Sequence, residues 1–294
     1  MDIKQVKELL SGEGYISDDA ISMSIHLSML LKKPLLIEGP AGVGKTEIAK
    51  VLAKAIDTEL IRLQCYEGLD ANHAIYEWNY QKQLLFLKMQ ENENLTLKEK
   101  EASIFSDDFL MKRPLLKSIT QDKSPVLLID EIDRSDEEFE SFFLELLSDW
   151  QITIPEIGTQ KATSIPHVII TGNRTRELSE ALRRRCLYLW IDYPEFEKEL
   201  NIVLSKHPDI NRKLADQICL FMKEIRQLKL EKNPGIAETL DWATALSSMH
   251  IDHLDHEIVE STLGVILKDW QDIRTSQDSL AELFEKVGVQ QRLA

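Results

Sequence analysis

Short apolar runs alternate with longer amphipathic stretches over the first two thirds of the chain. In the amphipathic stretch after the first run, Ile48, Val51, Leu52 and Ala55 recur at helical spacing. This alternation predicts an α/β fold with a five-stranded parallel sheet. The five runs are too short for helices and lack regular polar alternation, as expected of buried parallel strands: Pro34–Glu38, Ile61–Gln64, Val126–Asp130, His167–Thr171 and Leu187–Ile191.

Two stretches are longer than a minimal α/β unit requires. Residues 66–121 separate the second and third runs, and a gap of this length predicts an insertion with its own structure. In residues 151–166, Ile152 and Ile154 alternate with Thr153 and precede Gly158. This pattern predicts a β-hairpin just before the fourth strand.

Beyond Pro194 the sequence shows helical periodicity alone. Three amphipathic helices are predicted, around Leu214–Leu228, Thr239–Met249 and Ile258–Ile273. We therefore expect an α/β domain over residues 1–193 and an all-helical domain over residues 194–294.

A glycine-rich segment lies between the first predicted strand and the helix after it. Its glycines let backbone N–H groups turn toward one phosphate, and the following helix adds its positive N-terminal end. We expect Lys45 to reach the β- and γ-phosphates and the Thr46 hydroxyl to ligate Mg²⁺. The segment, which predicts ATP binding, matches G-x-x-x-x-G-K-[ST] in full: Gly39, Pro40, Ala41, Gly42, Val43, Gly44, Lys45 and Thr46.

Two carboxylates follow four aliphatic residues at the end of the third predicted strand. Asp130 is expected beside the phosphate loop, where it would hold Mg²⁺. Glu131 comes one residue later and is a candidate general base for the attacking water. This pair indicates ATP hydrolysis rather than phosphate transfer to a small molecule.

Charge and composition narrow the range of partners. Lys plus Arg number 35 and Asp plus Glu number 50, which gives a net charge of −15 and disfavours nucleic acid as the substrate. No apolar run reaches the roughly 18 residues of a membrane span, and the charged N-terminus does not resemble a signal peptide. Three widely spaced cysteines indicate reduced thiols, so we expect a cytoplasmic protein without a membrane partner.

With Val168–Asn173 following the phosphate loop and the Asp130–Glu131 pair, the chain resembles the AAA+ ATPases. The resemblance implies that Asn173 orients the attacking water. It also implies that the arginine of the Arg185–Cys186 step just before the fifth strand, Arg185, with Arg184 as the alternative, reaches the γ-phosphate held by a neighbouring subunit. That role requires an oligomer. Tyr15 and Ile16 stand where this superfamily often contacts adenine, or they serve ordinary packing.

Five further phrases are Arg62–Leu69, Tyr76–Tyr80, Asn173–Ser179, Ala181–Leu187 and Ala237–Trp242. With these phrases, the insertion and the hairpin, the chain resembles the helix-2-insert group of AAA+ proteins and, within it, the MoxR family, closest to the CoxD-like branch. This resemblance implies a hexameric chaperone or remodeller with a von Willebrand factor A domain partner. It implies as client a molybdenum hydroxylase of the carbon monoxide dehydrogenase type.

Two features leave alternatives open. Many AAA+ proteins carry a sensor arginine on the helical lid, but Gly235–Leu240 contains none. Either the lid is not coupled to the nucleotide in this way, or Thr239 or a neighbouring subunit substitutes. His250, His253 and His256 are spaced three apart and form either a metal site or, as we favour, a polar helix face. A non-hydrolysing ATP-gated scaffold and a DNA-linked ATPase remain alternative functions.

Overall fold

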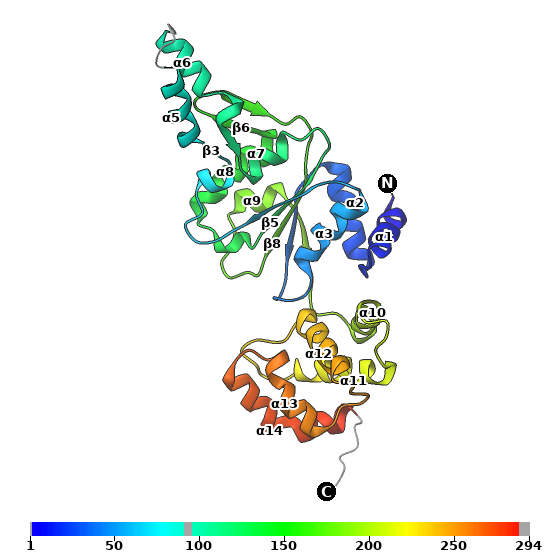
Figure 1. Cartoon of the computed structure of the whole chain (residues 1–294). Coiled ribbons are helices and arrows are strands. Elements are labelled where there is room, and N and C mark those ends of the chain that lie inside the picture. The colour runs from blue at the N-terminus through cyan, green and yellow to red at the C-terminus, as the bar shows by residue number, and fades with distance from the viewer. Residues whose placement is uncertain (1, 91–95, 288–294) are drawn as a thin grey trace. The chain divides into compact units, whose positions relative to one another are not determined.

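The computed structural model describes residues 2–90 and 96–287. The chain folds into two compact units (Figure 1). Each unit takes residues from more than one part of the sequence. The first unit comprises residues 2–9, Asp18–Glu38 and Thr46–Trp190, and the second comprises Leu10–Ser17, Gly39–Lys45 and residues 191–287.

A five-stranded parallel sheet in the order β2-β5-β8-β1-β9 forms the centre of the first unit, which confirms the predicted fold class. The predicted strand ends are correct to within one residue. The inner strands β1 and β5 are buried along their whole length. The edge strands alternate between buried and more exposed positions, because successive side chains point to opposite faces of the sheet. The strands are β1 (Leu35–Glu38), β2 (Leu60–Gln64), β5 (Val126–Asp130), β8 (His167–Gly172) and β9 (Leu187–Trp190).

Helices connect the parallel strands and pack on the sheet. Helix α2 contacts β1 and β9, and α7 contacts β2 and β5. Helix α2 begins where the Asp18 carboxylate accepts a hydrogen bond of 2.8 Å from the Ile21 amide, which satisfies a donor at the helix N-terminus. The helices before Pro194, outside the insertion, are α1 (Ile3–Gly12), α2 (Asp19–Leu31), α3 (Lys45–Ala55), α8 (Glu137–Asp149) and α9 (Glu180–Arg185).

The stretch after β2 has structure of its own. Its strands β3 and β4 pair antiparallel, and the buried Trp78 packs edge-on against Phe105 at 5.2 Å between ring centroids. Residues 91–95 of this stretch lie outside the described residues. Its elements are α4 (Ala71–Ala74), β3 (Tyr76–Trp78), α5 (Tyr80–Met89), α6 (Leu97–Ile104), η1 (Asp107–Phe109), β4 (Leu110–Lys112) and α7 (Pro114–Ile119).

A second antiparallel pair precedes β8. Strand β6 (Gln151–Ile154) pairs with β7 (Gly158–Lys161), and Gly158 takes a positive φ of 81° at the turn. Glycine suits that position because a left-handed backbone carries little steric cost without a Cβ. The predicted hairpin is therefore present.

The second unit is helical from Phe196 onward. Trp242 and Phe221 meet in its core with ring centroids 5.3 Å apart. The single helix predicted over Ile258–Ile273 is wrong, because the helix ends at Ile266. A new helix begins after Asp269, whose carboxylate accepts a hydrogen bond of 2.7 Å from the Gln271 amide. The helices are α10 (Phe196–Lys206), α11 (Arg212–Ile225), α12 (Ile236–Ser248), α13 (His256–Ile266) and α14 (Trp270–Val287).

The spaced histidines do not form a helix face. His250 and His253 lie in the connection between α12 and α13, and His256 begins α13 and stacks on Phe284. Across residues 2–90 and 96–287, no group of three or more His, Cys, Asp or Glu side chains could hold a metal ion. In the same residues, no helix has both the length and the apolar character needed to cross a membrane.

Candidate active site

The glycine-rich loop belongs to the second unit and is shaped by three glycines. Gly42 and Gly44 take positive φ values of 75° and 90°, which favour glycine. A Cβ at Gly39 would lie 1.9 Å from the Ile191 carbonyl oxygen, so this position excludes every larger residue. The loop folds around Lys45, a residue that is 7% exposed and whose ammonium donates to the carbonyls of Gly39 at 2.8 Å and Pro40 at 2.5 Å.

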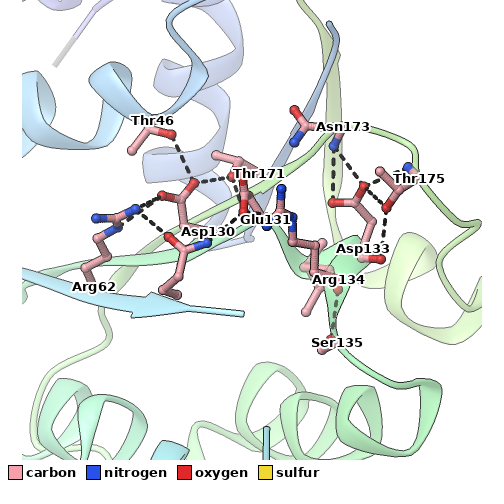
Figure 2. A network of polar contacts seen from close by, with 12 residues as sticks. Thr46, Arg62, Asp130, Glu131, Asp133, Arg134, Ser135, Thr171, Asn173 and Thr175 are labelled. Atoms are coloured by element: carbon pink, nitrogen blue, oxygen red, sulfur yellow. Dashed lines mark hydrogen bonds and ion pairs between the residues drawn. The ribbon is translucent and has the colours of Figure 1, made fainter. Parts of the chain in front are cut away.

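The next residue, Thr46, contacts the acidic end of β5 in the first unit (Figure 2). Its hydroxyl donates to Asp130 Oδ1 at 3.0 Å. The Thr171 hydroxyl from β8 donates to the same oxygen at 2.6 Å, and Arg62 from β2 donates to Oδ2 from Nε at 3.0 Å and from Nη2 at 2.6 Å. The structure therefore brings the two predicted Mg²⁺ ligands together, with Asp130 held by both neighbouring strands.

Glu131 leaves the strand with a strained backbone. Its φ of 56° and ψ of 51° are left-handed, which is uncommon for a residue with a side chain and typical of functional sites. Its amide donates to the Thr171 hydroxyl at 3.0 Å. Its carboxylate accepts a bond of 2.9 Å from the Gln64 side-chain amide and pairs with Arg134 at 3.0 Å. Thr171 thus connects the two acidic residues through one hydroxyl.

Asp133 fixes the segment that carries Asn173. The Asp133 carboxylate accepts bonds from the Asn173 amide at 3.1 Å, the Thr175 amide at 2.8 Å and the Thr175 hydroxyl at 2.7 Å (Figure 2). Burial opposes ionisation of this carboxyl, but the hydrogen bonds from Thr175 and Asn173 outweigh it and hold the Asp133 pKa below its ordinary value. Asn173 therefore starts from a fixed backbone position at the end of β8.

The three consecutive arginines have different surroundings. Arg183 Nη2 lies 3.9 Å from a Glu38 carboxylate oxygen, and its guanidinium lies over the Tyr188 ring at 6.0 Å. Arg184 is 76% exposed and pairs with Glu180 one helical turn earlier at 2.5 Å. Arg185 donates to the Ser148 hydroxyl at 2.7 Å and to the Ala181 carbonyl at 2.9 Å. The ion pair of Arg184 is exposed on both sides, and such a surface pair contributes little to stability.

Tyr15 and Ile16 lie in the turn after α1, in the same compact unit as the glycine-rich loop. Both are half-buried, and the Tyr15 amide donates to the Leu10 carbonyl at 3.0 Å. Their predicted contact with adenine stays a prediction.

Sequence reasoning missed several residues of this polar network, among them Arg62, Gln64, Thr171 and Asp133. The first two occupy alternate positions of β2, and this alternation within an otherwise apolar strand was the available signal. Thr171 and Asp133 gave no comparable sign, because their partners lie about 40 residues away in the sequence. Cys65 follows β2, and its buried thiol has a pKa raised to about 12 by desolvation and by Asp130, which makes it a poor nucleophile.

The donor set at the end of β5 fits a magnesium ion that is shared with a nucleotide. A hydroxyl and a carboxylate, Thr46 and Asp130, supply hard oxygen ligands within 3.0 Å of each other. No complete metal cage of acidic, histidine or cysteine side chains exists in the part of the chain that the structure describes. Magnesium typically takes its remaining ligands from phosphate oxygens and water.

Comparisons with known proteins agree with this architecture. Residues 34–186 match the family model described as AAA domain (dynein-related subfamily). An uncharacterised protein of Staphylococcus haemolyticus is 24% identical over 248 residues, covering 80% of this chain and 86% of that protein. A Staphylococcus aureus relative, also uncharacterised, is 25% identical with the same coverage. A mutant of Thermotoga maritima RuvB shares the fold, with a TM-score of 0.51, 18% identity and coverage of 97% and 82% of the two chains.

Proposed function

The chain belongs to the AAA domain family, dynein-related subfamily, and from this we propose that it is an ATPase that uses hydrolysis to remodel a protein client. The observation that carries the proposal is the contact between Thr46 and Asp130, because it connects the end of the phosphate loop to the acidic pair. Lys45 directly precedes Thr46 in the sequence, and its ammonium is the charge expected to bind the phosphates.

In this proposal the loop amides and Lys45 bind the β- and γ-phosphates. Thr46 and Asp130 would hold Mg²⁺, which neutralises charge on the phosphates when bound. Glu131 takes a proton from the attacking water while the bond from water to the γ-phosphorus forms and the bond to the ADP oxygen breaks. Gln64 and Arg134 hold the Glu131 carboxylate, and Asn173 orients the water.

A finger arginine completes the site from a neighbouring subunit, so the active form is an oligomer. Arg185 and Arg184 are both candidates. The exposure of Arg184 and its single surface ion pair favour it, because little has to be broken before it reaches another subunit. Arg185 would first have to release Ser148 and the Ala181 carbonyl.

The resemblance to the MoxR family and its CoxD-like branch supports a finer proposal. We infer a homo-hexamer that works in the cytoplasm with a von Willebrand factor A domain protein, on a molybdenum hydroxylase client. In this proposal, residues 1–193 form the nucleotide-binding domain, with 66–121 as its insertion, residues 194–294 form the lid, and Tyr15 and Ile16 contact adenine. A net charge of −15 weighs against a DNA-linked role; salt-sensitive DNA binding by the purified protein would reopen it.

The test is steady-state phosphate release by the parent, by Glu131→Gln and by the charge-matched control Glu138→Gln. Glu138 is exposed on α8, so its variant should hydrolyse ATP as the parent does. Loss of the general base should lower turnover of Glu131→Gln by about 100-fold or more, with ATP affinity preserved. A parent that binds ATP as an oligomer but releases no phosphate would establish the non-hydrolysing scaffold instead.

Mixing variants tests the finger. Glu131→Gln subunits supply an intact arginine, and Arg184→Ala subunits supply an intact Glu131. Mixed oligomers should recover turnover that neither variant has alone, because some interfaces then contain both groups. The same mixture with Arg185→Ala tests the other candidate, and recovery with neither would argue against a finger at this position.

A further inference from the structure

A turn before α12 lies directly against the phosphate loop within the second unit. The amides of Ile236 and Ala237, at the start of α12, donate to the Gly42 carbonyl at 2.9 and 3.2 Å. A Cβ built at Gly235 would lie 2.8 Å from the Ala41 carbonyl oxygen and from two backbone atoms of Gly42. The backbones of the turn and the loop therefore touch with no room for a side chain.

Gly235 is a glycine because of this contact and not because of its own backbone. Its φ of −90° and ψ of −169° are extended values that any residue adopts. An alanine at 235 would therefore keep the local backbone and clash with the loop alone. Glu238 adds to the turn by accepting the Gly235 amide at 2.8 Å.

The buried ion pair between Arg226 and Glu199 supports the turn before α12. Arg226 Nε donates to the Pro234 carbonyl at 2.8 Å, and its two terminal nitrogens bond the Glu199 carboxylate at 2.6 and 2.7 Å. The side chains of Arg226 and Glu199 are 6% and 1% exposed. Thr239 donates to Glu199 at 2.6 Å and is fully buried, so it does not present its hydroxyl to a ligand as a substitute sensor. Arg226 thus contacts this turn, but its guanidinium bonds the Pro234 carbonyl and the Glu199 carboxylate instead of facing a ligand.

We propose that the Pro234–Ala237 turn is a latch that fixes the phosphate loop in its binding conformation, and that Arg226 is its positioning residue. A peptide unit is planar and trans, so holding the Gly42 carbonyl also fixes the direction of the Val43 N–H. That N–H is one of the amides expected to wrap a phosphate. Removing the latch lets the loop sample other orientations, and binding then has to order it again.

This inference rests on the proposed function, because it concerns the affinity of the same loop for nucleotide. The latch acts on binding and leaves Glu131 untouched. Its loss should raise the Kd and KM for Mg·ATP and the Kd for Mg·ADP, with little change in kcat. A merely structural role would lower the amount of folded protein without producing this division between KM and kcat.

The experiment measures Mg·ATP and Mg·ADP affinity by calorimetry for the parent, Gly235→Ala and Gly264→Ala. Gly264 is in α13 with no atom within 4 Å of a built Cβ, so its variant is the matched glycine control. We expect Gly235→Ala to bind both nucleotides at least 10-fold more weakly and Gly264→Ala to match the parent. Amide exchange at Ile236 and Ala237 should accelerate in Gly235→Ala, because those N–H groups lose the Gly42 carbonyl.

Arg226→Lys provides a second test should Gly235→Ala fail to fold. A lysine keeps a charge beside Glu199 but lacks the planar fork that bonds Glu199 and Pro234 together. We expect its Kd for nucleotide to rise 3- to 10-fold with kcat preserved. Parent-like affinity in the folded variants would overturn the latch and leave the proposed function intact. A parent without affinity for Mg·ATP would overturn both.

Discussion

Two acid–arginine pairs, one in each unit, differ in how far the arginine is exposed. In the first unit the Asp130 side chain is 4% exposed, but its partner Arg62 is 51% exposed. In the second unit Arg226 and Glu199 are 6% and 1% exposed. In the open pair, Arg62–Asp130, the half-exposed arginine can exchange its partner for water at low cost. In the sealed pair, Arg226–Glu199, both side chains are buried, and separating them leaves a buried charge without a partner. The difference predicts that the buried pair contributes more to stability than the half-exposed pair.

The largest expected effect comes from breaking the sealed pair. Arg226→Met leaves Glu199 buried without a cation and should lower the free energy of unfolding by about 3–5 kcal/mol. Arg62→Met should cost about 1–2 kcal/mol, because the Thr46 and Thr171 hydroxyls still donate to Asp130. Urea unfolding of the two variants makes the comparison. A double variant, Arg226→Met with Glu199→Leu, should recover most of the loss, since no charge remains buried. An equal loss of unfolding free energy in Arg226→Met and Arg62→Met would show that the two pairs do not differ in their contribution to stability.

The next effect concerns the hydroxyl that joins the two acids at the open site. Thr171→Val keeps the shape but leaves the Glu131 amide and an Asp130 oxygen without their buried partner, at a cost of about 1–3 kcal/mol. Because Glu131 then loses its fixed position, turnover should fall by about 10-fold with ATP affinity preserved. Thr171→Ser keeps the hydroxyl and should restore most of the turnover. Parent-like phosphate release by the valine variant would show that this hydroxyl does not position Glu131.

Asp133 extends the comparison to a buried carboxylate that is held by hydrogen bonds from Asn173 and Thr175 instead of by an arginine. Its pKa is lowered, so its contribution to stability is present above the unfolded pKa, near 3.8, and disappears as pH falls through the lower folded pKa. Asp133→Asn should cost about 1–2 kcal/mol near neutral pH. Urea midpoints across the pH range should show a constant gap between parent and variant from pH 7 to 5. The gap should narrow below about pH 4; a gap that changes near pH 6 would implicate another group.

The smallest effect on stability is expected for an ion pair in which both side chains are exposed. Arg184 and Glu180 are 76% and 78% exposed and lie one helical turn apart. Arg184→Gln should change the free energy of unfolding by less than about 0.5 kcal/mol, as measured by urea unfolding of the same preparation used for phosphate release. A large loss of stability would mean that Arg184 supports its own subunit, and its candidacy as a finger would then weaken.

Local patterns in the sequence predicted the sheet well and the helical unit less well. Buried parallel strands are continuous apolar runs, so all five were found to within one residue. The error over Ile258–Ile273 arose because apolar spacing continues through Leu267, whereas the break depends on Asp269 capping the next helix. A cap is one side chain in one conformation, and periodicity does not record it.

Within the candidate active site, the residues that belong to contiguous motifs could be predicted from the sequence. The residues that bond to those motifs from other parts of the chain could not. The phosphate loop and Asp130–Glu131 could be recognised because their chemistry demands contiguous residues. Arg62, Thr171 and Asp133 act through partners on other strands or loops, and their importance is visible once the sheet order places β2, β5 and β8 side by side.

The sequence by itself determined the α/β class, the phosphate loop and the acidic end of β5, because each is written in consecutive residues whose local physics is sufficient. The tertiary structure alone decided that Thr171 joins the two acids, that Arg226 is sealed against Glu199, and that Gly235 is a glycine because the Gly42 backbone lies against it. These features are distances between residues far apart in the chain, and such distances are set when the whole core packs.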